Sequence, residues 1–110
     1  MLSGGIIKAA MKRRGYRHRR LDGDFSIRGE YARNLQYVYS KEFDTPEGIV
    51  VDLVYFAVDV VDEKLVVGLF RENPTIENGL HLNVSRMLPL RRFSAEEVEN
   101  LLDKLIVDLK

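Results

Sequence analysis

The hydrophobic pattern between residues 35 and 85 is typical of β-strands, because apolar side chains recur at every second position. A first strand carries Leu35, Tyr37, Tyr39 and Phe43 on one side, and the positions on its other side are mostly polar. Residues 49–61 are apolar on both sides in their middle, which predicts a central strand or a strand at a subunit interface. Residues 65–71 and 80–85 predict two further strands, and residues 25–28 predict a short one before them.

Turn-forming residues separate these strands. In residues 44–48, Pro46 presets its own φ, and Gly48 supplies the positive φ that closes a hairpin. Residues 62–64 predict a tight turn between the next two strands. Pro89 is expected to end the last strand, because proline cannot donate a hydrogen bond to a sheet ladder. Short connections of this kind predict an antiparallel meander.

Helical periodicity is confined to the two ends of the chain. Near the N-terminus, one helix face carries Ile6, Ile7, Ala10 and Met11. Gly15 suits the position after this helix. At the other end, Ser94 and Glu97 form a capping box before an apolar stripe at helical spacing. The stripe consists of Val98, Leu101, Leu102, Leu105, Ile106 and Leu109.

These elements predict one α+β domain over residues 1–110, with residues 1–20 as a basic N-terminal helix or arm. Its core would be an antiparallel meander of four or five strands, with the amphipathic C-terminal helix packed on one face. The chain contains no cysteine, which excludes a disulfide scaffold and a thiol nucleophile. No apolar run approaches the roughly 20 residues that span a bilayer, and arginines follow the N-terminal apolar stretch, unlike in a signal peptide. We therefore expect a cytoplasmic protein without membrane association.

Charge is strongly segregated along the chain, although the net charge is zero. The acid-free first 20 residues carry Lys8, Lys12, Arg13, Arg14, Arg17, Arg19 and Arg20. All 17 acidic residues lie after them. Such asymmetry favours a basic segment that meets a polyanion, provided that no internal carboxylate neutralises it. Alternatively, the same cations dock on the acidic body of this chain or of a second copy.

A nucleic acid is the polyanion that the residue types favour. Arginine binds phosphate through a planar, bidentate fork, and an interleaved tyrosine offers a ring on which a base can stack. The tyrosines of the first strand offer a second stacking surface, unless they pack under a helix instead. The candidate nucleic-acid-binding residues are Lys12, Arg13, Arg14, Tyr16, Arg17, Arg19, Arg20, Arg28, Arg33, Tyr37 and Tyr39. We also expect a homodimer, and the alternative function is a homodimeric protein-interaction module, for example a viral or accessory factor, that binds no nucleic acid.

Catalysis finds little support in the sequence. Asp52, Asp59 and the 62–64 triplet loosely match a magnesium-dependent nuclease pattern, but the triplet lies in a predicted turn. Asp52 and Asp59 are an odd number of positions apart, so a regular strand directs them to opposite faces. His18 and His81 have no partner at metal-ligand spacing. The prediction is therefore a protein that is not an enzyme and has no metal or cofactor.

Overall fold

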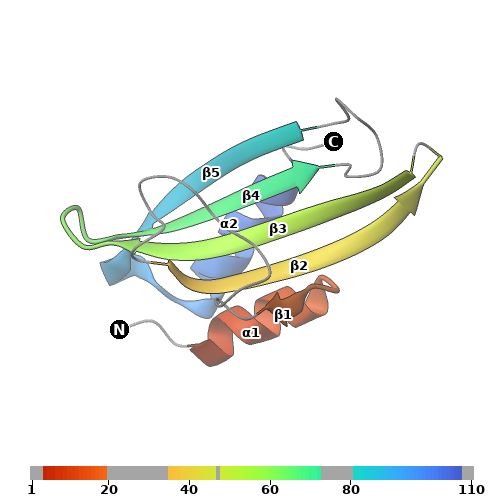
Figure 1. Cartoon of the computed structure of the whole chain (residues 1–110). Coiled ribbons are helices and arrows are strands. Elements are labelled where there is room, and N and C mark those ends of the chain that lie inside the picture. Colours follow the sequence, from red (N-terminus) through yellow and green to blue (C-terminus); the bar gives the residue numbers. More distant parts are fainter. Residues whose placement is uncertain (1–3, 20–34, 47, 73–80, 108–110) are drawn as a thin grey trace.

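The computed structural model describes residues 4–19, 35–46, 48–72 and 81–107, and it confirms an α+β fold with one antiparallel sheet (Figure 1). The elements in chain order are α1 (Gly4–Arg13), β1 (Arg17–Arg19), β2 (Leu35–Thr45), β3 (Gly48–Asp59), β4 (Lys64–Glu72), β5 (His81–Pro89), the short 3₁₀ helix η2 (Leu90–Arg92) and α2 (Ala95–Val107). The expected strand at 25–28 and the C-terminal Leu109 lie outside the described residues.

The sheet is a meander in which every strand pairs antiparallel with the next, in the order β1-β2-β3-β4-β5. The predicted hairpin between β2 and β3 closes with Thr45 opposite Gly48, whose φ of 121° lies in the region that favours glycine. The tight turn before β4 joins Asp59 and Lys64, which face each other across the two strands. Strand β5 ends at Pro89, as the sequence predicts.

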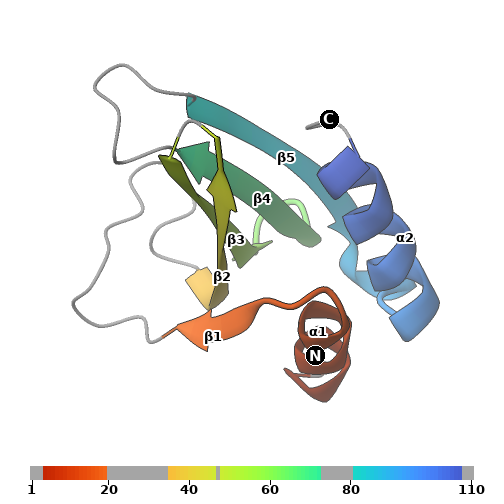
Figure 2. The ribbon, with the colours of Figure 1, turned by 90° about the vertical axis from the view of Figure 1, so that its right-hand side faces the viewer.

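Both helices lie on the same face of the sheet, α1 beside β1 and α2 beside β4 and β5, and they contact each other (Figure 2). The predicted capping box begins α2, because the backbone N–H of Glu97 donates to Ser94 Oγ at 3.2 Å. Helix α1 ends before Gly15, whose φ is +83°. Within the described ranges, neither helix is long and apolar enough to cross a membrane.

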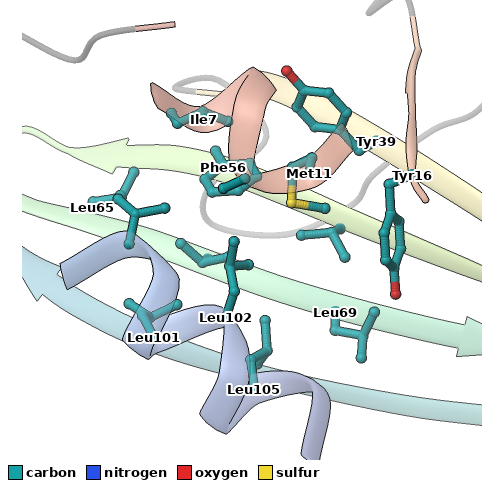
Figure 3. Close-up of a cluster of buried hydrophobic side chains, with 14 of the residues drawn as sticks. Ile7, Met11, Tyr16, Tyr39, Phe56, Leu65, Leu69, Leu101, Leu102 and Leu105 are labelled. Carbon is teal, nitrogen blue, oxygen red and sulfur yellow. The ribbon is translucent and has the colours of Figure 1, made fainter. Parts of the chain in front are cut away.

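The core lies between this sheet face and the two helices (Figure 3). Alternate residues of β3 and β4 supply its floor, because successive side chains of a strand point to opposite faces. The helices supply the other wall. The fully buried members include Ile7, Met11, Val54, Phe56, Leu65, Val67, Leu69, Val98, Leu102 and Leu105. Burial of so many large apolar groups is the main stabilising contribution to the fold.

Strand β1 differs from the sequence expectation, which treated residues 16–20 as a connection. Three successive polar residues, Arg17, His18 and Arg19, have none of the alternation that marks a strand. They form one because their backbone pairs with β2, with His18 opposite Tyr39. The N-terminal basic segment is therefore a helix and an edge strand of the described sheet rather than a loose arm.

Candidate nucleic-acid interface

Helix α1 carries cations on two sides of its buried face. Ile7, Ala10 and Met11 face the core, which fixes the rotation of the helix about its axis. One side then presents Lys8 and Lys12, four residues apart and both exposed. The other side and the turn after the helix direct Arg13 and Arg14 toward α2.

Arg14 connects the two helices. Its guanidinium donates to Glu99 Oε2 at 2.5 Å, to Asp103 Oδ1 at 2.6 Å and to the Ala10 carbonyl at 3.0 Å. Arg13 also forms an ion pair with Glu99. The expectation that no internal carboxylate neutralises the seven cations is therefore wrong for these two arginines, because α2 places its acidic side beside them. Arg14 is only 15% exposed, whereas the Arg13 side chain remains 59% exposed.

Strand β1 distributes its cations over both faces of the sheet edge. His18 lies opposite Tyr39 and so faces the helices, whereas Arg17 and Arg19 lie on the other face, opposite Ser40 and Val38. Arg17 is exposed and Arg19 is half-buried. With the described part of the chain, Lys8, Lys12 and Arg17 form no ion pair or side-chain hydrogen bond. The candidates Arg20, Arg28 and Arg33 lie outside the described residues.

The candidate tyrosines are packed in the core or under α1. Tyr39 is 3% exposed and meets Phe56 edge to face, with ring centroids 6.1 Å apart. Its burial raises its pKa, and the neighbouring phenol of Tyr37 adds to the effect. Tyr37 lies under the start of α1, where a Cβ on Gly4 would be 2.8 Å from its hydroxyl oxygen. These positions match the alternative of packing under a helix, and Tyr39 has no free face for a base.

His18 is the exposed ring at this edge of the described sheet. Its centroid lies 5.2 Å from that of Tyr39 and 6.4 Å from that of Tyr37. The imidazole therefore lies beside both tyrosine rings and is itself exposed to solvent. A ring held in this way can contact a nucleotide base, which makes His18 a candidate stacking group that the sequence pattern did not indicate.

Tyr16 belongs to a buried polar cluster with Asp52 and Arg71. Asp52 is 1% exposed, and its carboxylate accepts from Arg71 Nε at 2.6 Å and from Nη2 at 2.9 Å. The hydroxyl of Tyr16 donates to Asp52 Oδ2 at 3.0 Å. Burial, together with the carboxylate of Asp52, raises the pKa of Tyr16 well above its usual value. The hydrogen bond to Asp52 raises the pKa of Arg71, so the guanidinium stays protonated.

The strand alternation of the sequence contains a signal for this cluster, although no motif does. Asp52 has the same strand parity as the buried Val50 and Val54, so its charge points into the core and requires a partner. Arg71 has the same parity as Leu69 on the next strand. The register aligns them directly. With both oxygens of Asp52 occupied, this carboxylate serves the ion pair, and the described residues contain no group of three metal-ligating His, Asp or Glu side chains.

Comparisons of the chain with known protein families, with curated proteins and with solved structures found no match. An assignment of function therefore rests on the chemistry of its own residues.

Proposed function

We propose that this protein binds nucleic acid through a basic surface made of Lys8, Lys12, Arg17 and Arg19. The observation that carries the proposal is that Lys8, Lys12 and Arg17 are exposed, while residues 1–20 contain no acid. Long cationic side chains on an ordered helix and strand are suited to contact several phosphates of one strand or duplex.

Phosphate contacts of this kind have a measurable signature. Each cation that neutralises a phosphate releases condensed counterions, so the logarithm of the binding constant falls linearly with the logarithm of the salt concentration. The slope is roughly −0.7 to −0.9 per phosphate contact. Three contacts from Lys8, Lys12 and Arg17 therefore predict a slope about two to three units steeper than that of a protein without them.

The test is fluorescence anisotropy with labelled single-stranded and duplex oligonucleotides, titrated over a range of salt concentrations. The variant K8Q/K12Q/R17Q removes three exposed cations of the basic surface. Its matched control, R91Q/R92Q/K104Q, removes three exposed cations from η2 and α2. We expect the first variant to lose binding at low salt and to flatten the slope, and the control to bind like the wild type.

Absence of binding by the wild type at low salt would refute the proposal. Equal losses in the two variants would also contradict it, because they would show that net charge rather than this surface attracts the nucleic acid. Homodimer formation stays a prediction, and light scattering on the same samples measures it.

A further inference from the structure

A cleft of about 430 Å³ opens beside the buried polar cluster of Tyr16, Asp52 and Arg71. Its lining residues are Arg14, Tyr16, Lys41, Phe43, Asp52, Arg71, Asp103 and Ile106. This volume lies within the range of small-molecule pockets. Charged groups and apolar walls share the space, since Phe43 and Ile106 are both half-buried beside the buried ion pair of Asp52 and Arg71.

Arg71 is held in one orientation at the floor of this cleft. Asp52 accepts hydrogen bonds from Nε and Nη2, and the guanidinium carbon lies 5.2 Å from the ring centroid of Phe43. The hydroxyl of Tyr16 donates a further hydrogen bond to Oδ2 of the same carboxylate. Among the described residues, no group accepts a hydrogen bond from Arg71 Nη1. An arginine with one edge fixed and the other edge unused is a preorganised donor for an anion.

Lys41 supplies the second cation. Its Nζ donates to the carbonyl oxygen of Arg14 at 3.2 Å and lies 5.7 Å from the ring centroid of Tyr16. No carboxylate of the described chain forms an ion pair with it, so two of its three N–H donors remain for a ligand. The other charges of the cleft are balanced, because Arg71 pairs with Asp52, and Arg14 pairs with Asp103. Lys41 therefore leaves the cleft with one excess positive charge.

We propose that this cleft binds a small organic acid, whose carboxylate contacts Lys41 Nζ and Arg71 Nη1 and whose apolar part lies against Phe43 and Ile106. A single excess charge matches a monoanionic carboxylate better than a dianionic phosphate. Asp52 and Tyr16 act as positioning residues for Arg71. This binding activity is independent of the proposed nucleic-acid surface, because it uses other residues.

The experiment follows amide NMR spectra of the full chain during titration with four probes: acetate, isovalerate, phenylacetate and 3-phenylpropionate. Each acid is compared with its neutral amide. We expect at least one of the larger acids to shift the resonances of Lys41, Phe43, Arg71 and Ile106, and its amide to bind at least about tenfold more weakly. Acetate should bind more weakly than the larger acids, because it lacks the apolar part.

The variant Lys41→Met keeps the length of the side chain and removes its charge without leaving a buried carboxylate unpaired. It should weaken binding of the acid about tenfold, whereas the matched control Lys12→Met on α1 should not change it.

Three results would each overturn the proposal. The first is the absence of cleft shifts with all four acids at about 20 mM, well above a millimolar Kd. The others are equal binding of acid and amide, and unchanged binding by Lys41→Met. Loss of nucleic-acid binding in K8Q/K12Q/R17Q leaves all of these readouts unaffected.

Discussion

The buried polar cluster of Tyr16, Asp52 and Arg71 and the basic surface around α1 and β1 treat charge in opposite ways. In the cluster, Asp52 is 1% exposed and Arg71 is 17% exposed, and each is held by hydrogen bonds to its partners. On the basic surface, Lys8 and Lys12 stay exposed to solvent and require no partner. Loss of a cation from the cluster should therefore reduce folding stability. Loss of a cation from the basic surface should instead reduce nucleic-acid binding.

Arg14 lies between these extremes, since it is mostly buried yet pairs with carboxylates at the surface of α2. The comparison thus predicts a gradient of stability effects that follows burial. Arg71 stands at one end, Arg14 in the middle, and Lys8 and Lys12 at the other end.

The largest effect should come from Arg71→Met, which leaves the carboxylate of Asp52 buried without its cation. Breaking a buried pair in this way costs about 3–5 kcal/mol in the free energy of unfolding, measured by urea denaturation. The double variant D52L/R71M removes both charges and should recover most of that loss. A double variant as unstable as Arg71→Met would show that packing of the arginine, rather than its charge, stabilises this region.

Arg14→Met should lower the free energy of unfolding by about 1–2 kcal/mol, because it removes hydrogen bonds to Glu99, Asp103 and the Ala10 carbonyl. Arg13→Met is the matched control. The Arg13 side chain is 59% exposed, and the loss should stay below about 1 kcal/mol. Equal effects of the two substitutions would contradict the gradient with burial.

Tyr16→Phe removes one hydrogen bond to a carboxylate and should cost about 1 kcal/mol at neutral pH. The folded-state pKa of Tyr16 is raised, whereas the unfolded value is near 10. Above about pH 10 the unfolded chain releases the phenol proton of Tyr16, whereas the folded chain keeps it. The free energy of unfolding of the wild type therefore falls as pH rises, by up to about 1.4 kcal/mol per pH unit. Urea denaturation from about pH 8 to 11 should show the difference between wild type and variant shrinking. A constant difference would mean that Tyr16 titrates normally in the folded protein.

The smallest effect on stability is expected for K8Q/K12Q. Neither lysine forms an ion pair or side-chain hydrogen bond with the described residues, so the free energy of unfolding should change by less than about 0.5 kcal/mol. Binding of an oligonucleotide should nevertheless weaken, with a salt slope flatter by roughly 1.4–1.8 units. A loss of stability without any change in oligonucleotide binding would contradict this prediction, because it would show that the two lysines stabilise the fold and do not contact the nucleic acid.

Local patterns were sufficient to predict most of the secondary structure. Period-2 alternation, the hairpin turn within residues 44–48 and the capping box at Ser94 act over a few residues, and the structure confirms each of them. The turn predicted at 62–64 is present but begins earlier, at residues 60–63, so Val60 and Val61 lie in the turn and Lys64 begins β4. Strand β1 escaped prediction because its pairing energy comes from the backbone of β2 rather than from its own side chains.

The sequence by itself determined where the positive charge is concentrated, since a run of cations without acids is visible in the primary structure. Only the tertiary structure decided which of these cations are neutralised. Arg13 meets Glu99 because both helices pack on one face of the sheet, and Arg71 meets Asp52 because the strand register aligns residues 19 positions apart. Ion pairs depend on distance in space, and a linear pattern contains no information about that distance until the chain has folded.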